Sequence, residues 1–191
     1  THLDASGISR AISTDYCNGT GEKIASVSST PEGNYVHAHA VYDNEGRLYE
    51  KWQPVGVSTD GYQSISTVSA SAKSFYSDPS PYTRYEYDAL GRVIEQTGPG
   101  DTWYKMGKKI KKSYISNSAN SVICYEAPTE NNSLVENGCY KAASLFCEET
   151  TDEDGHTLQV FTDFQGEKVL ERKDGNNDTY YVYNDYGELR F

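Results

Sequence analysis

One ten-residue stretch, Tyr85 to Ile94, constrains the fold of this chain more than any other feature, and it reads Tyr-Glu-Tyr-Asp-Ala-Leu-Gly-Arg-Val-Ile. Tyr85 and Tyr87 alternate with acidic residues, so both rings fall on one face of a strand. Asp88 suits the first position of a type I turn, and Gly91 suits a following residue with positive φ. The stretch therefore predicts a β-hairpin whose turn ends in a glycine bulge.

Three looser copies of this pattern occur along the chain. Each has an alternating strand followed by Asp or Asn and, three positions later, by glycine. A single hairpin is marginal alone because it buries only one narrow face. The recurrence therefore indicates a repeat architecture in which each hairpin packs against its neighbours. The residues that we assign to the repeated turns and their flanking strands are Tyr42, Asp43, Gly46, Arg47, Tyr85, Tyr87, Asp88, Gly91, Arg92, Phe161, Asp163, Gly166, Tyr181, Tyr183, Asn184 and Gly187.

The spacing of the four turn glycines indicates how regular the repeat is. Gly166 and Gly187 are 21 residues apart, and Gly46 and Gly91 are 45 apart, which is near twice that period. Gly91 and Gly166 are 75 residues apart. We therefore expect either a drift in register or an insertion between these last two glycines.

These motifs resemble the YD repeat of the rearrangement hotspot (RHS) family, whose core is Tyr-x-Tyr-Asp-x-x-Gly-Arg-Leu. Residues 85–93 match that core with Val93 in place of leucine, and residues 42–48 match its second half. The segments 98–100, 150–155 and 178–183 are also similar to the amino-terminal region of large bacterial RHS proteins. The resemblance covers residues 35–191, whereas residues 1–34 carry no clear match.

The resemblance implies a fold, a role and a location. In that family the repeats assemble a long β-sheet strip that can curl into a hollow shell, often ahead of a variable carboxy-terminal toxin. It implies a non-catalytic structural module of a cell-surface or secreted, extracytoplasmic protein. Its partners would be adjacent repeats of the parent polypeptide and an encapsulated toxin or a surface ligand. Because the chain stops at Phe191, directly after a repeat, we expect it to be a piece of a longer polypeptide.

Composition supports the same fold class. Seventeen tyrosines and five phenylalanines stand against one methionine, which favours sheet over helix because rings pack well on pleated surfaces. We therefore predict an all-β fold of antiparallel hairpins in a curved or twisted sheet, and leave open whether the sheet closes on itself. The net charge of -11 argues against a nucleic-acid partner, since phosphate contacts need clustered Lys and Arg. No stretch approaches the roughly 18 apolar residues of a membrane helix.

Four segments between the repeats carry their own predictions. Residues 1–34 are expected to form a separate amino-terminal segment, either a degenerate hairpin or a mobile terminus. A short helix is compatible with residues 64–74, where Ile65, Val68 and Ala72 form a narrow apolar stripe. The five lysines between Trp103 and Ile115 suit either an anionic partner or, as we favour, a strand whose lysines protect a sheet edge. The Asn137-Gly138 pair predicts a two-residue hairpin turn.

Side chains that suit metal or thiol chemistry include two strand histidines, two acidic runs and four cysteines. His37 and His39 share a strand face, as zinc ligands do, but lack an obvious third ligand, so we expect solvent-facing histidines. The acidic runs at residues 148–154 and 174–178 lack the spacing of an EF-hand and suit turns. We therefore expect no metal and no cofactor. The chain has four cysteines, Cys17, Cys124, Cys139 and Cys147, which fit free thiols on strands as well as a disulfide. The extracytoplasmic location implied by the resemblance favours one disulfide among the last three, with the pair left open.

Three functions fit a chain of this kind. The first is the structural module, because the recurring residues are those a hairpin needs and none is a nucleophile paired with a base. The second is a carbohydrate- or protein-binding module that uses exposed rings such as Trp52 and Trp103. The third is an enzyme with an Asp/Glu pair, but the chain has neither a Gly-x-Ser-x-Gly nor a His-Glu-x-x-His pattern. We rank them in that order and predict no catalytic residues.

Overall fold

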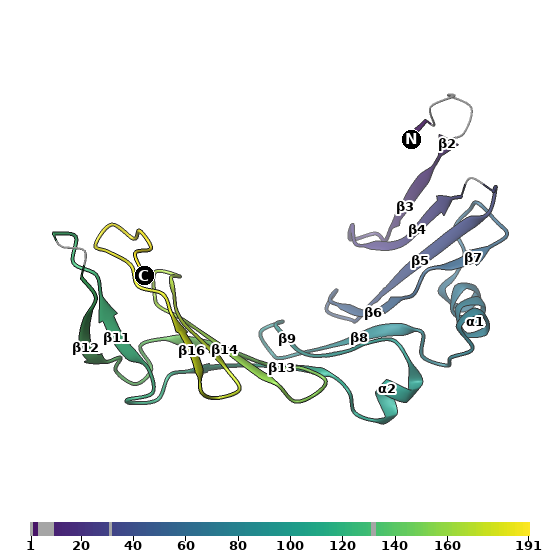
Figure 1. Ribbon diagram of the computed structural model, residues 1–191. Helices are drawn as coiled ribbons and strands as arrows, with labels where there is room; N and C mark the ends of the chain where they lie inside the picture. The colour runs from purple at the N-terminus through teal and green to yellow at the C-terminus, as the bar shows by residue number, and fades with distance from the viewer. Residues whose placement is uncertain (1, 4–9, 31, 131–132) are drawn as a thin grey trace. The chain divides into compact units, whose positions relative to one another are not determined.

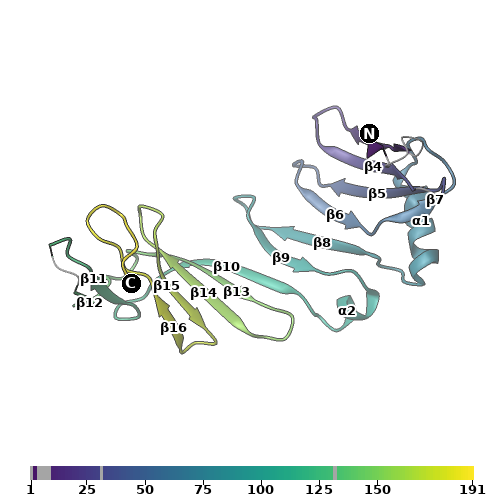
Figure 2. The same cartoon turned by 45° about the horizontal axis from the view of Figure 1, so that its top comes forward.

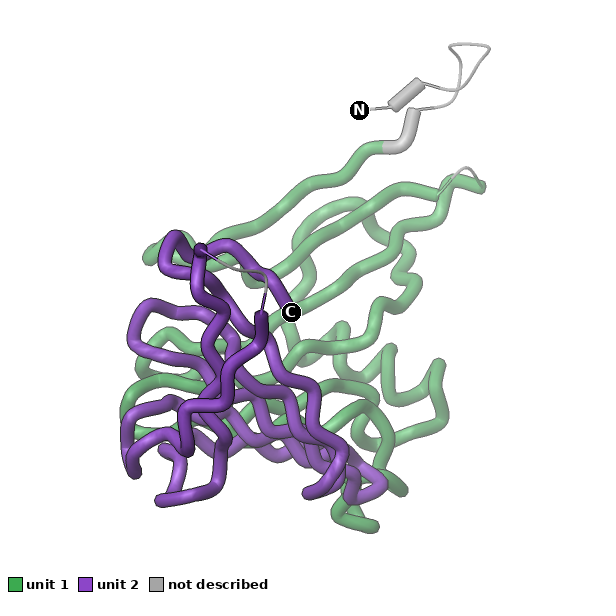
Figure 3. Tube along the Cα trace, turned by 60° about the vertical axis from the view of Figure 1, so that its left-hand side comes forward, with its two compact units in different colours: residues 1–109 green, residues 110–191 purple. Residues whose placement is uncertain are grey.

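A computed structural model describes residues 2–3, 10–30, 32–130 and 133–191 of the chain (Figure 1). The predicted fold class is confirmed: the chain is built mainly from antiparallel strands, in open, twisted sheets. It divides into two compact units, residues 1–109 and residues 110–191 (Figure 3). Neither of the described helices, α1 (Ile65–Tyr76) and α2 (Asp101–Lys105), is long and apolar enough to cross a membrane.

The first unit is a sheet in which strands are neighbours in nearly the order of the sequence. The order is β3-β4-β5-β6-β8-β9, with β7 paired to β5, and a separate pair joins β1 (His2–Leu3) to β2 (Arg10–Ala11). The strands are β3 (Ser13–Cys17), β4 (Lys23–Ser29), β5 (Tyr35–Tyr42), β6 (Leu48–Trp52), β7 (Val55–Val57), β8 (Tyr82–Tyr87) and β9 (Val93–Thr97).

The division expected after residue 34 does not coincide with the boundary between the compact units. Residue 34 ends the turn between β4 and β5, and these two strands pair from Ala25 opposite His39 to Ser29 opposite Tyr35. The amino-terminal strands therefore belong to the same sheet as the repeats, because their edge hydrogen bonds are made with β5. Residues 1 and 4–9 of that segment lie outside the described residues.

Helix α1 covers one face of the first sheet, as Figure 2 shows beside β7. The helix begins after Ser64, whose side chain accepts a hydrogen bond from the backbone N–H of Thr67, an N-cap arrangement. Val68 and Ala72, two members of the predicted apolar stripe, are fully buried and pack with Trp52 and Val55. The short helix expected here is present, and it supplies the apolar cover that a single sheet layer needs.

The second unit is a smaller antiparallel sheet with a hairpin packed on it. The strand order is β10-β13-β14-β15-β16, and β11 pairs with β12. A row of Cys147, Phe161, Leu170 and Tyr180 crosses four neighbouring strands at matched register. The strands are β10 (Ile110–Ser116), β11 (Ile123–Glu126), β12 (Val135–Cys139), β13 (Phe146–Thr151), β14 (Thr157–Thr162), β15 (Lys168–Lys173) and β16 (Asn177–Tyr180).

The row is covered by residues from the segment between β10 and β13. Val122 and Leu145 are buried in one cluster with Cys147, Phe161 and Leu170. The hairpin of β11 and β12 adds a ring contact, with Tyr125 edge-on to Tyr180 at 5.0 Å between centroids, and the Tyr180 hydroxyl accepts a hydrogen bond from the backbone N–H of Ile123. The inserted hairpin therefore does for this sheet what α1 does for the first.

Two local predictions are wrong. The Asn137-Gly138 pair makes no turn but lies inside β12, where Gly138 has φ 71° and an extra residue interrupts the pairing with β11. Both structures use a glycine with positive φ, so the dipeptide alone does not distinguish a bulge from a turn. The lysine-rich segment is likewise not one edge strand: it contains α2 and then β10, which pairs with β13.

The lysines of this segment pair with carboxylates instead of guarding an edge. Lys105 lies 2.5 Å from Asp101, Lys112 lies 2.6 Å from Glu148 on the partner strand, and Lys109 bonds to Glu95. These three lysines are therefore paired with carboxylates of α2, β9 and β13 and do not form the edge of a sheet.

Candidate functional site

The turn at Asp88 shows how the repeated residues close a hairpin. The backbone N–H of Asp88 donates to the carbonyl of Arg92 at 2.9 Å, and the N–H of Gly91 donates back to the carbonyl of Asp88 at 3.0 Å. One carboxylate oxygen of Asp88 accepts from the N–H groups of both Leu90 and Arg92, each at 2.9 Å. The aspartate therefore satisfies two backbone donors that the tight turn would leave unpaired.

The described part of the chain contains six turns with this same set of four hydrogen bonds. In each, the side-chain oxygen of Asp or Asn accepts at 2.9–3.1 Å from the N–H groups two and four residues later. The glycine three residues later has φ between 75° and 94°, a region that a Cβ opposes. The turns are Asn18–Gly21, Asp43–Gly46, Asp88–Gly91, Asp152–Gly155, Asp163–Gly166 and Asn184–Gly187.

Two of these turns escaped assignment to the repeat from the sequence. The turn at Asn18 lies in the segment expected to be a degenerate hairpin or a mobile terminus, and the turn at Asp152 lies in the acidic run at residues 148–154. Neither has the flanking Tyr-x-Tyr pair. The signal that finds them is the shorter pattern of Asp or Asn followed three positions later by glycine, because those two residues make the bonds that define the turn.

In two turns an arginine follows the glycine and binds the same aspartate. Arg92 donates its Nε–H to Asp88 at 2.7 Å, and Arg47 donates its Nε–H to Asp43 at 2.8 Å. The N–H and guanidinium of Arg92 hold the pKa of Asp88 below its ordinary value. For Asp43, desolvation raises the pKa, but the N–H and guanidinium of Arg47 outweigh it and lower the pKa overall. Both carboxylates are therefore charged acceptors in the turn.

Successive turns on one side of the first sheet are tied to one another. The tyrosine before each turn aspartate reaches back to the preceding hairpin: Tyr42 donates its hydroxyl to the carbonyl of Lys23 at 3.1 Å, and Tyr87 donates to the carbonyl of Leu48 at 2.8 Å. Each acceptor stands five positions after the Asn or Asp of the earlier turn. The tyrosines of the motif therefore link neighbouring hairpins as well as packing on strands.

A second contact also recurs between neighbouring turns. The residue four positions after the turn Asp or Asn contacts the next turn on that side. Arg47 places its guanidinium carbon 5.0 Å from the Tyr87 ring centroid and donates to the carbonyl of Asp88 at 3.5 Å. In the second unit, a Cβ added to Gly187 would meet the Glu167 carboxylate at 3.0 Å, and His156 lies 3.3 Å from Asp174. The turns stack in both units, with different side chains in contact.

The other aromatic residues of the predicted repeat motif lie at different positions in the two units. Phe161 is buried in the core of the second unit, Tyr181 lies under the Lys168 ammonium at 3.9 Å, and Tyr183 pairs with Leu189 in an isolated bridge. Tyr85 faces the open side of the first sheet. The predicted residues thus form a series of turns along the sheets and do not converge on one site.

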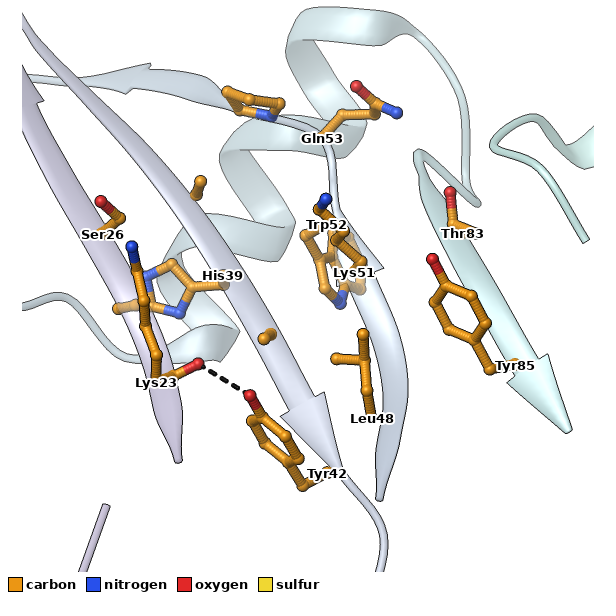
Figure 4. A pocket seen from close by; sticks show the side chains of 14 residues that line it. Lys23, Ser26, His39, Tyr42, Leu48, Lys51, Trp52, Gln53, Thr83 and Tyr85 are labelled. Carbon is orange, nitrogen blue, oxygen red and sulfur yellow. Dashed lines mark hydrogen bonds between the residues drawn. The ribbon is translucent and has the colours of Figure 1, made fainter. Parts of the chain in front are cut away.

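The open face of the first sheet carries a groove of about 740 Å³ (Figure 4). Its lining includes small side chains such as Ala38 and Ala40, which leave the strands uncovered, and polar or aromatic ones contributed by β5, β6 and β8, namely Tyr42, Lys51, Thr83 and Tyr85. The Lys51 side chain is exposed. This face is the opposite of the one that α1 covers, because Ala38 and Ala40 alternate along β5 with the buried His37 and His39.

Three expectations about single residues need correction or placement. His37 and His39, expected to face solvent, are buried at 0% and 4% exposure, because the segment after β7 covers that strand face. Trp52, expected to be exposed, is 6% exposed and packs against Tyr82 at 4.7 Å between ring centroids. Trp103 is 47% exposed on α2.

The disulfide that the resemblance favours among Cys124, Cys139 and Cys147 is not formed. All four cysteines are free thiols, and burial raises the pKa of Cys147 to about 11, with Glu149 adding to the rise, so this thiol is a core residue. Within the described ranges, no group of three or more His, Cys, Asp or Glu side chains is arranged to hold a metal ion.

Comparison with known proteins gives a family. No curated protein matches the chain. One family model, described as "Domain of unknown function (DUF6443)", matches residues 3–116, which is more than half of the chain. The matched region contains the first three of the six turns, the inserted helix α1 and the open groove. The chain therefore belongs to the DUF6443 family.

Proposed function

We propose that this chain is a non-catalytic structural module whose repeated hairpins form a β-sheet segment of a cell-surface or secreted protein, similar to RHS and YD-repeat proteins. The observation that carries the proposal is the recurrence of one turn, with the same four hydrogen bonds, at six places in the described chain. A site that binds or catalyses needs one arrangement of unlike groups, whereas a scaffold needs the same arrangement many times.

The contacts between turns support the same function. Tyr42 and Tyr87 each bond to the hairpin before them, so one unit of the repeat gains stability from the previous one. That is the behaviour of a repeat protein, in which stability is the sum of units and nearest-neighbour interfaces. The partners that we propose are adjacent repeats of the parent polypeptide and an enclosed toxin or surface ligand, in an extracytoplasmic location.

Three variants of the Asp88 turn test the structural role. Replacing Gly91, at φ 79°, by valine should lower the free energy of unfolding by about 1–3 kcal/mol, because a β-branched residue opposes positive φ. Asp88→Ala should have a smaller effect in the same direction, since it removes the acceptor of two backbone N–H groups.

Ala89→Ser is the matched control, because it lies in the same turn without a special backbone demand, and it should melt with the wild type. Thermal melts of the four proteins decide the question. If Gly91→Val melts with the wild type, the glycine has no structural role in the turn and the proposal fails.

The groove on the open sheet face favours a second candidate function, binding of a carbohydrate. Sugars are held by aromatic faces together with hydrogen-bond donors, and the groove offers Tyr42 and Tyr85 beside Lys51 and Thr83. Screening with a panel of labelled oligosaccharides would reveal such binding. The Lys51→Ala/Tyr85→Ala variant should abolish it, while Lys111→Ala, an exposed lysine of β10, should leave it unchanged. Absence of binding to the wild type would remove this candidate.

A further inference from the structure

Two histidines are buried side by side on β5, under the segment that follows β7. His37 and His39 are 0% and 4% exposed, and their rings are stacked with centroids 6.5 Å apart and planes 16° apart. The strand neighbours at matched register are apolar: Val27 and Val55 lie opposite His37, and Ala25 lies opposite His39. Two imidazoles therefore occupy an environment that offers little solvation to a positive charge.

The hydrogen bonding of this pair is incomplete. His37 uses Nε2 to contact the backbone carbonyl of Thr59 at 2.8 Å, so this nitrogen carries the proton in the neutral ring. His37 Nδ1 and His39 Nε2 are buried and have no hydrogen-bond partner among the described residues. A proton added at Nδ1 of His37 would create a buried donor with no acceptor and a charge with no counter-ion.

The pair also holds a loop against the sheet. Residues 58–62 follow β7 and lead toward α1, and the Thr59 carbonyl is their hydrogen bond to the sheet within the described part of the chain. The Tyr62 ring packs on His39 at 6.0 Å and on Tyr16 of β3 at 5.4 Å. The loop is therefore fixed by one hydrogen bond and by ring contacts, all of which involve or adjoin the two imidazoles.

The charged and titratable groups on the surrounding elements do not offset a charge on the pair. Those on the same strand face or on the segments packed against it are Tyr16 of β3, Lys23 of β4, Tyr35 of β5, Glu50 of β6, Asp60 and Tyr62 of the loop, and Lys73 and Tyr76 of α1. Lys23 pairs with Asp15 at 2.7 Å, and the Tyr76 hydroxyl donates to the carbonyl of Pro54. Glu50 accepts from the Trp52 indole at 3.1 Å, Lys73 lies over the Trp52 ring, and Asp60 is exposed. None of them makes an ion pair or hydrogen bond with either imidazole in the described contacts, so no carboxylate is ready to accept the added proton.

We propose that the His37–His39 pair is an acid-sensitive latch, which holds residues 58–62 on the sheet while both rings are neutral and releases them when the rings are protonated. Release brings the imidazoles to water, where the charged form is solvated. The loop covers the buried face of the sheet and connects β7 to α1, so its release loosens the helix side of the first unit and leaves the repeated turns in place.

The direction of the pH dependence follows from the buried state of the pair. Burial lowers the pKa of His39 below its ordinary value of 6.5, and the neighbouring His37 lowers it further. The released state therefore takes up protons at a higher pH than the closed state does. The closed state is fully stable above about pH 6.5 and loses stability as the pH falls below that value.

Hydrogen–deuterium exchange of the whole chain at about pH 7.5 and about pH 5.5 tests the latch, after correction for the intrinsic pH dependence of exchange. Protection of residues 55–68, which span the loop and the hydrogen-bonded ends of β7 and α1, should fall on the order of tenfold at the lower pH. About pH 5.5 lies one unit below the ordinary histidine pKa of about 6.5, so an imidazole released to water is then mostly protonated. Protection of β14 and β15 should stay the same, and returning to the higher pH should restore the loop.

Variants identify the groups responsible. His37→Gln combined with His39→Phe keeps an amide donor for the Thr59 carbonyl and an aromatic ring under Tyr62, but removes both proton-binding sites. This double variant should exchange equally at the two pH values. His156→Gln, at a 71% exposed side chain in the second unit, should behave as the wild type.

The latch is refuted by equal protection of the wild-type loop at both pH values, or by an unchanged pH response in the double variant. Should that variant fail to fold, an NMR titration of the wild type decides: the His39 ring signal must change together with the signals of the loop as the pH falls. Protonation of His39 without any change in the loop signals would overturn the proposal.

Discussion

The two units close their hairpins with the same turn but cover their sheets with unrelated structures. In residues 1–109 the segment between β6 and β8 supplies β7 and α1, whereas in residues 110–191 the segment between β10 and β13 supplies the hairpin of β11 and β12. Each insertion buries apolar residues on one face of its sheet, Val68 in one case and Val122 in the other. The turn thus determines where strands reverse, and the insertion determines which face is buried.

The ends of each insertion are joined by polar contacts. In the second unit, the buried Asn117 accepts from the N–H of Leu145 at 2.8 Å and donates to the carbonyl of Lys141 at 2.7 Å. In the first, the N–H of Gln53 donates to the carbonyl of Pro81 at 2.9 Å, which joins the two ends. The Asp78 carboxylate links the insertion to α2 by accepting from the N–H of Asp101. One buried side chain closes the second insertion, whereas the first is closed mainly by backbone groups.

The largest expected effect comes from the core of the second unit. Leu170 is fully buried in the row that crosses the sheet, so Leu170→Ala should leave a cavity and lower the free energy of unfolding by about 3 kcal/mol. Leu189→Ala, at a 56% exposed side chain, is the control and should change little. Denaturant melts followed by hydrogen exchange would show which strands lose protection. Loss spread equally over β4, β5 and β6 would show that the two units do not unfold separately.

Asn117→Ala should have the next largest effect, about 2 kcal/mol, because it leaves the buried N–H of Leu145 and carbonyl of Lys141 without partners. Ser118→Ala, at the exposed neighbour, should be silent in the same denaturant melts. If the two insertions are closed differently, Asp78→Ala should lower the free energy of unfolding less than Asn117→Ala does. An equal cost would mean that both insertions depend on one side chain.

Glycine variants distinguish the turns of the two units. Gly91→Ala should cost about 1 kcal/mol, the usual penalty of a Cβ at positive φ. Gly187→Ala should lower the free energy of unfolding slightly more, because its Cβ would also meet the Glu167 carboxylate at 3.0 Å, a flexible side-chain end that can shift, whereas the Gly91 position is open. A double-mutant cycle with Glu167→Ala measures the difference. Equal costs in the two turns, with no coupling to Glu167, would contradict the stacking of neighbouring turns.

Acid should have the smallest effect, and only on turns closed by aspartate. The Arg92 contacts lower the folded-state pKa of Asp88, so the charged carboxylate stabilises the turn above the ordinary value of 3.8, and this contribution is lost as the pH falls through the lower folded value. Asp88→Asn keeps the carbonyl acceptor, as Asn184 does naturally, and should make this turn insensitive. Thermal melts at about pH 5 and pH 3 compare the two proteins, and an identical loss in both would assign the acid response elsewhere.

The turns could be predicted from the sequence because they are local. Asp88 and Gly91 make every bond of the turn within five residues, so residue type and spacing are sufficient. The 45-residue interval between Gly46 and Gly91 is not two repeat periods. It contains the insertion of β7 and α1, and the two hairpins are direct neighbours because β6 pairs with β8. Spacing alone does not distinguish an extra repeat from an insertion.

The buried polar residues could not be predicted, for the opposite reason. His37 is covered by Thr59, which is 22 residues away, and the partners of Asn117 are 24 and 28 residues away. The residue patterns around His37 and Asn117 do not show which distant segment will pack on them. The insertions are irregular in sequence, so the residues that they bury on each sheet can be identified only from the fold.

The tyrosine hydrogen bonds between hairpins of the first sheet all run from a later hairpin to an earlier one in the chain. Tyr42 and Tyr87 each donate backward, to a carbonyl that belongs to a hairpin earlier in the chain. A chain emerging from the ribosome therefore presents each of these two acceptors before its tyrosine donor has been synthesised. The sheet can be extended in the order of synthesis through contacts between neighbours, with low topological complexity and without a long-lived exposed intermediate.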